Sequence, residues 1–158
     1  MREIKFRGKT EDDMIFEDGK IVDKGTWVYG SLIVNGELPY IVGGVIESDS
    51  EYIALEYWYP CDKDSIGQLT GLKDKNGVEI WDGDIIRIVA HMVTLDGKAT
   101  KDKDSISTYK VFYHPKRCQW FMERLTSNKG RTIGFEEELN YIVSHYWEVI
   151  GNIHEDNI

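Results

Sequence analysis

The chain has 158 residues, of which 41% are hydrophobic and 12% aromatic, and its formal net charge is −9 at pH 7. This length and composition allow one compact domain or two small ones with a buried core, and they exclude a disordered acidic polypeptide. The acidic balance argues against general nucleic-acid binding, which depends on cations that neutralise phosphates.

Two further features limit the classes of protein to which the chain can belong. No stretch approaches the roughly 20 apolar residues that span a bilayer, and residues 1–7 lack the apolar core of a secretory signal. Cys61 and Cys118 have no paired spacing, so they form neither a zinc site nor a disulfide framework. We therefore expect a cytoplasmic protein with two free thiols and no contact with a membrane.

Residues 1–66 are predicted to form an antiparallel β region. Residues 26–34 are rich in aromatic and β-branched side chains, which favour strands. Asn35-Gly36 follows them and supplies the positive φ angles that a tight hairpin turn needs. Residues 52–59 alternate imperfectly and indicate another strand. No stretch of this half has helical periodicity of useful length.

Residues 67–84 are predicted to form a turn-rich connector. Asn76-Gly77 is a second hairpin signal, and Asp82-Gly83-Asp84 precedes a β-branched run at residues 85–89. Glycine permits a close turn and an aspartate bonds neighbouring backbone amides, a pattern common where a chain enters a small, strongly bent barrel. We therefore expect a strand to begin near the first residue of that run, and the turn residues to be structural.

Residues 85–158 are predicted to form a second domain. Residues 96–107 are polar and mixed in charge, which indicates an exposed loop or a flexible hairpin tip. Residues 136–145 carry apolar side chains three and four positions apart behind acidic ones, which predicts one short helix. The further strands expected in this half are residues 109–113, 119–123 and 147–154.

Four blocks of sequence carry a family resemblance. They are residues 1–7 (MREIKFR), residues 27–32 (WVYGSL), the block from residue 66 to residue 86, and residues 148–155 (EVIGNIHE). In this order they resemble the YopX-like proteins of bacteriophages and prophages of low-GC Gram-positive bacteria, and they span nearly the whole chain. The resemblance implies a mainly β fold with an SH3-like barrel in the C-terminal half and an N-terminal β region. It implies no established activity and no catalytic residues.

A calcium loop of the EF-hand kind is incomplete in this sequence. Aligning Gly77 with the sixth position of such a loop puts Leu72 at the first ligand position and Gly83 at the twelfth. Both positions require oxygen ligands. The turn therefore does not predict a calcium site.

Other reactive groupings are weak as well. Glu79, Asp82 and Asp84 surround one turn, where acidic residues are more often solvated than bound to a metal. His114 and Cys118 are four residues apart, but no third group is in evidence to orient the histidine beside the thiol. We predict no catalytic residue, no cofactor, no metal site and no small-molecule substrate.

The many aromatic residues predict a packed core with two or three rings left for an interface. Residues 110–131 interleave such rings with lysine and arginine, and the candidate interaction surface there consists of Arg117, Trp120 and Arg124. A solvated hairpin flanked by arginine and lysine stems explains the same pattern.

Two hypotheses of function follow. The leading one is a non-enzymatic phage or prophage accessory protein that binds another protein, or forms a homo-oligomer, through exposed sheet edges and aromatic side chains. The alternative is a nucleic-acid-binding module that uses residues 110–131, where bases would stack on aromatic rings while cations follow the phosphates.

Overall fold

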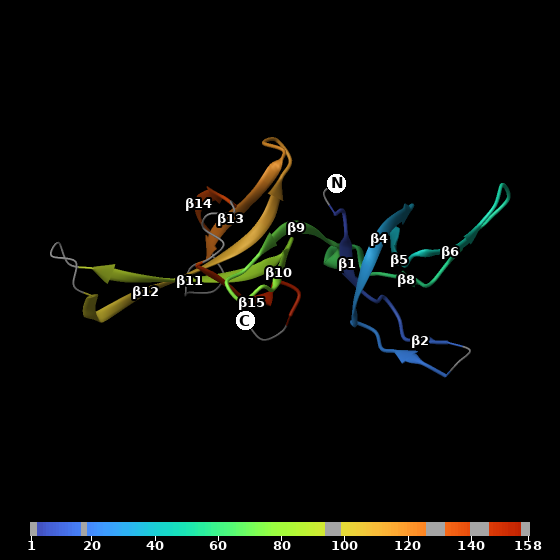
Figure 1. Ribbon diagram of the computed structural model, residues 1–158, viewed down its shortest axis with the longest axis horizontal. Coiled ribbons are helices and arrows are strands. Elements are labelled where there is room, and N and C mark those ends of the chain that lie inside the picture. Colours follow the sequence, from blue (N-terminus) through green and yellow to red (C-terminus); the bar gives the residue numbers. More distant parts are fainter. Residues whose placement is uncertain (1–2, 17–18, 94–98, 126–131, 140–145, 156–158) are drawn as a thin grey trace. The chain divides into compact units, whose positions relative to one another are not determined.

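The computed structural model describes residues 3–16, 19–93, 99–125, 132–139 and 146–155. The chain divides into two compact units, Met1–Leu69 (unit 1) and Thr70–Ile158 (unit 2). Both are built from antiparallel strands, so the predicted mainly β fold is confirmed (Figure 1). The described residues contain no α-helix, and their one helical element is a 3-10 turn, Lys63–Ser65.

Unit 1 has a main sheet in the order β9-β1-β4-β5-β8 and two hairpins, β2–β3 and β6–β7. The Asn35-Gly36 turn between β4 and β5 is confirmed, with Gly36 at φ 65°. The strands are β1 (Phe6–Lys9), β2 (Met14–Ile15), β3 (Ile21–Val22), β4 (Trp27–Asn35), β5 (Leu38–Val42), β6 (Val45–Ser48), β7 (Ile53–Leu55) and β8 (Trp58–Pro60). β9 (Gly67–Lys73) begins in unit 1 and ends in unit 2.

One face of the unit 1 sheet carries its core. Side chains alternate between the two faces of a strand, and those on this face include the fully buried Ile41 and Cys61. Gly8 packs against this core, and a larger residue would not fit there, because an added Cβ would lie 2.8 Å from Ile66 Cδ1. The buried members of this core are Val22, Val28, Ile41, Tyr59 and Cys61.

Unit 2 contains a five-stranded antiparallel sheet in the order β14-β13-β12-β11-β15. Its core lies on one face and includes Trp120, Met122 and the fully buried Trp147. The full set of buried residues in this core is Ile80, Ile86, Tyr109, Val111, Trp120, Met122 and Trp147. The strands of this unit are β10 (Glu79–Trp81), β11 (Asp84–Val93), β12 (Ala99–His114), β13 (Gln119–Leu125), β14 (Thr132–Glu138) and β15 (Trp147–Asn152).

Two buried aspartates hold the turns of unit 2. Asp74 Oδ1 accepts hydrogen bonds from the backbone amides of Asn76 and Val78, at 2.8 and 2.9 Å, while Asp74 Oδ2 accepts one from Val149 N at 3.0 Å. Asp84 accepts from Trp81 N and from Asn152 Nδ2. The middle and closing blocks of the family resemblance thus meet in shared hydrogen bonds.

Three expectations for the second half are revised. None of the described sheets closes into a barrel, so the SH3-like barrel is not confirmed; β14 and β15 are the two open edges of the five-stranded sheet. The helix expected at residues 136–145 is wrong at its start, because Thr132–Glu138 is strand β14, and residues 140–145 lie outside the described part. Of the two structures expected for residues 96–107, the exposed loop is wrong from Ala99 onward, because β12 pairs there with β11 as one strand of a hairpin; residues 94–98 lie outside the described part.

Candidate interaction surface

Cations and aromatic rings share the face of the unit 1 sheet opposite its core. Arg7 and Lys9 belong to β1 and Lys5 directly precedes it, and because the three are spaced two residues apart, they project from the same side of this extended segment. The register pairs Arg7 with Tyr29 and Lys9 with Trp27 on β4, which places the two rings beside the three cations. We call these five residues the cationic–aromatic face.

The contacts within this face are cation–π contacts. The Arg7 guanidinium carbon lies 4.6 Å from the Trp27 ring centre, Lys9 Nζ lies 5.4 Å from the same ring, and Lys5 Nζ lies 5.9 Å from the Tyr29 ring. Such contacts are worth about 0.5–1 kcal/mol at exposed sites and about 2 kcal/mol when desolvated. Arg7, which contacts the Trp27 ring, is only 7% exposed. Lys5 and Lys9 are partly exposed, and Tyr29 is 41% exposed. Both lysine side chains therefore lie partly exposed beside an exposed ring.

Tyr57, which directly follows the β6–β7 hairpin, holds the backbone of Tyr29 in the cationic–aromatic face. Its hydroxyl donates a 2.8 Å hydrogen bond to the backbone oxygen of Tyr29. Burial, with smaller contributions from Glu56 and Tyr59, raises the pKa of Tyr57, which keeps the hydroxyl protonated as a donor. Its ring packs so closely on Gly43 that an added Cβ there would lie 2.7 Å from a ring carbon.

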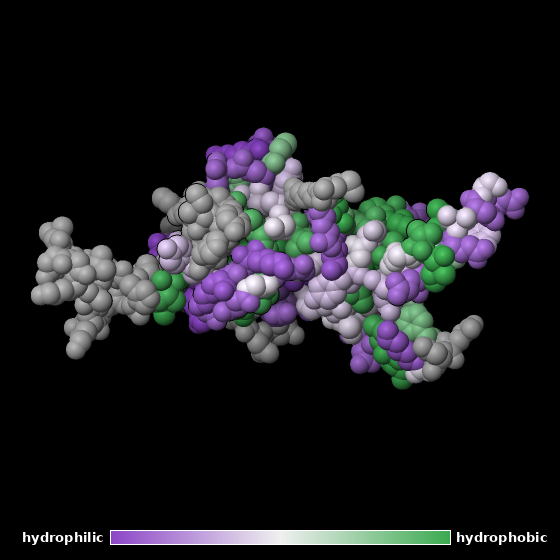
Figure 2. Space-filling view, in the orientation of Figure 1, coloured by the Kyte–Doolittle hydropathy of each residue, from purple (hydrophilic) through white to green (hydrophobic). Residues whose placement is uncertain are grey.

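The β6–β7 hairpin projects from the unit 1 sheet as an acidic arm, which we define as residues 45–56 (Figure 1). It exposes large apolar side chains, with Val45, Ile46 and Ile53 61–70% exposed. Its carboxylates are Glu47, Asp49, Glu51 and Glu56, and the chain has no lysine or arginine between residues 24 and 63. Figure 2 shows hydrophilic residues at the tip of the arm and hydrophobic ones toward its base.

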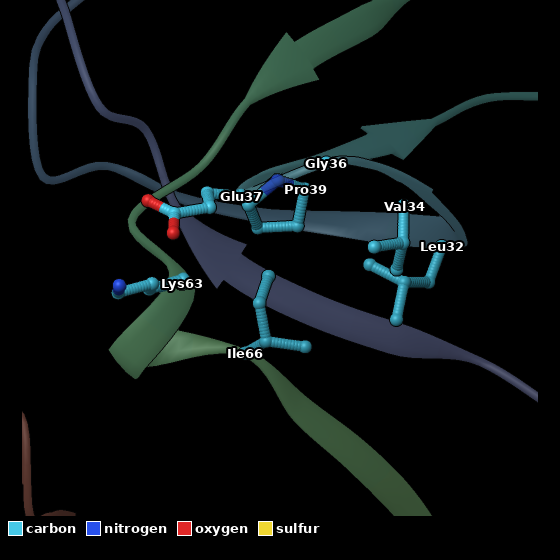
Figure 3. Close-up of a pocket in the computed structure, with 7 residues that line it drawn as sticks. All are labelled: Leu32, Val34, Gly36, Glu37, Pro39, Lys63 and Ile66. Carbon is cyan, nitrogen blue, oxygen red and sulfur yellow. The ribbon is translucent and has the colours of Figure 1, made fainter.

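A shallow pocket of about 310 Å³ lies beside the β4–β5 hairpin, between that hairpin and the 3-10 turn (Figure 3). Its walls are mostly apolar, and Glu37 and Lys63 are the charged residues that line it. It offers room for an apolar side chain and contains no nucleophile or metal ligand set. The lining residues are Leu32, Val34, Gly36, Glu37, Pro39, Lys63 and Ile66.

The three residues predicted as an interaction surface in unit 2 have different surroundings. Trp120 is 8% exposed and belongs to the core. Arg124 is exposed and donates to Ser107 Oγ at 3.0 Å. Arg117 is exposed and stacks 4.9 Å from the ring centre of Phe121, which alternates with Trp120 and so points to the opposite face of β13. The structure does not bring the three side chains together on one face.

The weak reactive groupings are accounted for by packing. Asp84 is 1% exposed and engaged with backbone and asparagine donors. The His114 ring packs 5.3 Å from Phe121, whereas the Cys118 thiol is exposed and donates to Pro115 O at 3.4 Å. Within the described ranges, no group of three or more His, Cys, Asp or Glu residues is placed to hold a metal ion.

Both cysteines are free thiols in the structure, as expected. Burial raises the pKa of Cys61 to about 11, and nearby Asp62 and Glu11 add to the rise. Cys61 is thus a buried, unreactive core residue.

Sequence reasoning missed the cationic–aromatic face. The signal was present as the Lys5-x-Arg7-x-Lys9 alternation, which puts three cations on one face of any strand. The aromatic partners on β4 become evident only from the strand register.

Comparison with known proteins places this fold in a family. The family model for YopX protein matches residues 5–157, so the chain belongs to the YopX family. Among solved structures, the chain is similar to the crystal structure of protein EF1440 from Enterococcus faecalis, with 22% identity, coverage of 99% of this chain and 96% of that one, and a TM-score of 0.48. No curated protein matches the chain. In the part of the chain that the structure describes, no helix has the length and apolar character needed to cross a membrane.

Proposed function

We propose that this YopX family member is a non-enzymatic accessory module of a bacteriophage or prophage that acts in the host cytoplasm by protein association, first of all with itself. One observation carries the proposal: unit 1 exposes large apolar side chains on both hairpins and on its main sheet. Contiguous exposed apolar surface is typical of interaction sites in soluble proteins. Those above 55% exposed in the strands of unit 1 are Ile15, Ile21, Val34, Val45, Ile46, Ile53 and Trp58.

The marginal stability of isolated hairpins supports the same function. A two-stranded hairpin is at best marginally stable in water unless it packs against another element. β2–β3 pairs the exposed Ile15 with the exposed Ile21, and β6–β7 exposes three aliphatic side chains. Association would bury these side chains and stabilise the hairpins.

The nucleic-acid alternative for residues 110–131 receives less support from the geometry. Two of its three expected stacking rings, Trp120 and Phe121, are buried, while Tyr113 is 42% exposed, and residues 126–131 lie outside the described part. Of the three predicted surface residues, Arg117 and Arg124 are exposed, and they lie toward different faces of β13. Protein association is therefore the better supported function.

Size-exclusion chromatography with light scattering tests the proposal. Between about 5 and 300 µM, we expect the mass to rise from that of one 18.3 kDa chain to that of an oligomer. Replacing the exposed Ile46 and Ile53 by serine should shift this transition to higher concentration. The matched control is replacement of Ile106, which is also exposed but lies in unit 2. A strictly monomeric chain at 300 µM would exclude self-association.

A further inference from the structure

Charge is segregated in unit 1. The cationic–aromatic face gathers Lys5, Arg7 and Lys9 on one side of one strand, and the acidic arm belongs to a 38-residue stretch without a cation, residues 25–62. Each surface also exposes apolar area, from the ring of Tyr29 on the face and from the aliphatic side chains of the arm. The two surfaces are therefore complementary in charge and both have apolar area to bury.

Each surface carries two charged side chains that are at least partly exposed. Lys5 and Lys9 lie four residues apart on the face, about 13 Å along the extended chain. On the arm, Glu47 and Glu51 are exposed on the two sides of the tip, and Asp49 is occupied at the turn, where its Oδ1 accepts from the amides of Glu51 and Tyr52 at 2.7 and 3.0 Å. Glu47 and Glu51 are thus the carboxylates available to meet Lys5 and Lys9.

The arm is held away from the face of its own chain. Its base continues the β5–β8 ladder through bonds from Gly43 N to Tyr57 O and from Glu56 N to Gly44 O, at 2.9 and 2.8 Å. The Tyr57 ring fills the space above Gly43, so the base cannot bend sharply there. From this base the arm projects beyond the sheet and away from β1 (Figure 1). A contact between the arm and such a face therefore requires two chains.

We propose that the acidic arm of one copy docks on the cationic–aromatic face of a second copy, with Glu47 and Glu51 meeting Lys5 and Lys9 and the aliphatic side chains of the arm covering Tyr29. This inference rests on the self-association form of the proposed function and names the surfaces that perform it. Because arm and face are different patches, the contact forms a closed pair when each copy gives its arm to the other, and a ring or chain when it does not.

A second copy fits the face better than a nucleic acid does. The face has three cations, one of which is largely covered by Trp27, and the chain as a whole carries −9. A polyanion would meet that unfavourable long-range field, whereas the arm brings a few carboxylates together with apolar side chains.

Charge reversal in the full chain tests the inference. The face variant is Lys5→Glu with Lys9→Glu, the arm variant is Glu47→Lys with Glu51→Lys, and the swapped variant combines all four. The control, Lys20→Glu with Lys24→Glu, makes the same change in net charge as the face variant at exposed positions of unit 1 outside the face. Association is measured by light scattering and sedimentation at about 50 and 500 mM salt, and folding by circular dichroism.

We expect the face and arm variants each to weaken self-association by about tenfold or more, because like charges then oppose each other. An equimolar mixture of the two should associate again, the swapped variant should recover self-association, and the control should behave as wild type. High salt should weaken the wild-type contact, since exposed charges are screened. If the face variant does not fold, Lys5→Gln with Lys9→Gln replaces it, with a smaller loss expected.

The contrary outcomes distinguish a failure of arm-to-face docking from a failure of self-association. Wild-type association that neither variant changes, or a loss that the mixture does not restore, overturns arm-to-face docking and leaves self-association through another surface. A wild-type chain that stays monomeric overturns both. A monomeric chain that binds a single-stranded oligonucleotide through Lys5 and Lys9 assigns the face to nucleic acid instead.

Discussion

Asp84 shows how one side chain joins two distant parts of the sequence. Its side chain is 1% exposed, and its two oxygens accept from Trp81 N at 2.8 Å and from Asn152 Nδ2 at 3.2 Å. Asn152 Oδ1 in turn accepts from His154 N. Gly83, at φ 82°, permits the turn, and an added Cβ there would lie 3.1 Å from Asn152 Nδ2. The Asp-Gly-Asp turn thus joins the start of β11 to the C-terminal segment through buried hydrogen bonds.

Removing either partner should therefore destabilise the chain. Asp84→Ala leaves buried donors without an acceptor, which costs about 2–3 kcal/mol of unfolding free energy. Asn152→Ala should cost a similar amount, and the double variant less than the sum, because the second change removes a group already without its partner. Urea unfolding of the three variants measures this coupling, with exposed Glu155→Gln as a control. Additive losses would mean that the two side chains act independently.

The two thiols should differ strongly in reactivity. The thiolate is the reactive form, and Cys61 is fully buried with its pKa raised to about 11 by that burial, whereas Cys118 is exposed. At pH 8 we expect a thiol reagent to label one cysteine within minutes and the second only after unfolding. Mass spectrometry of the labelled peptides identifies each site, and Cys118→Ser provides the control. Rapid labelling of Cys61 in the folded chain would contradict its place in the core.

At the scale of elements, the turn that follows β9 fastens the edge strand β15. Lys75 N donates to Trp147 O at 3.0 Å, and Asp74 Oδ2 accepts from Val149 N. Glu148 adds side-chain contacts, with Arg87 Nη2 at 2.8 Å and Lys75 Nζ at 3.1 Å from its Oε2. The backbone contacts cover part of an otherwise open sheet edge, which is a common protection against unwanted strand pairing.

The Glu148 contacts should appear in the pH dependence of stability. The hydrogen bond from Arg87, followed by that from Lys75, lowers the pKa of Glu148 below its ordinary value of 4.5. A lowered pKa in the folded state means that the stabilisation is complete above about pH 4.5 and is lost as the pH falls through the folded pKa. Glu148→Gln should therefore be less stable than wild type at pH 7, and the difference should shrink between pH 4.5 and pH 2.5.

Thermal unfolding across that pH range measures the difference, and Glu155→Gln makes the same change in charge at an exposed position beyond β15. A wild-type advantage that stays constant down to pH 2.5 would show that the Glu148 carboxylate does not contribute through its charge.

The elements predicted from sequence were those with a local signal. Asn35-Gly36 fixed the β4–β5 hairpin because the turn conformation depends on those residues themselves. β12 was missed between Ala99 and residue 107 because its residues there are mostly polar, and backbone pairing with β11 needs no apolar pattern. The start of the expected helix failed for a similar reason, since the strand β14 at Thr132–Glu138 is set by its register with β13.

The candidate surface was predictable only in part, and for the same reason. The cation alternation of β1 can be read from sequence, but its partners depend on the pairing of β1 with β4. The burial of Trp120 and Asp84 is likewise decided by residues far along the chain, with Asn152 lying 68 positions from Asp84. The burial of Trp120 has no local signal, whereas the Asp-Gly-Asp pattern predicted a structural role for Asp84 at its turn but not its distant partner Asn152.

For the whole molecule, the division into units predicts where the chain can be cut. Every residue of the unit 2 core lies within Thr70–Ile158, including Ile80 and the partly buried Leu72. A fragment that begins at residue 85, the domain start expected from sequence, lacks both of these side chains and also Asp74. It loses apolar burial, worth about 1.5–3 kcal/mol for each full aliphatic side chain, and leaves the amide of Val149 without its acceptor.

We therefore expect the fragment Thr70–Ile158 to unfold cooperatively on heating and the fragment of residues 85–158 to show no cooperative transition. Circular dichroism follows the strands, and fluorescence of Trp120 and Trp147, which both fragments retain, follows the core. Ile80→Ala in the longer fragment is an intermediate case that should lower its midpoint without abolishing the transition, because a cavity costs less than removal of the whole β10 strand. Equal, cooperative unfolding of both fragments would place the folding boundary at residue 85 and reduce β10 and the Asp74 turn to a dispensable cover on the five-stranded sheet.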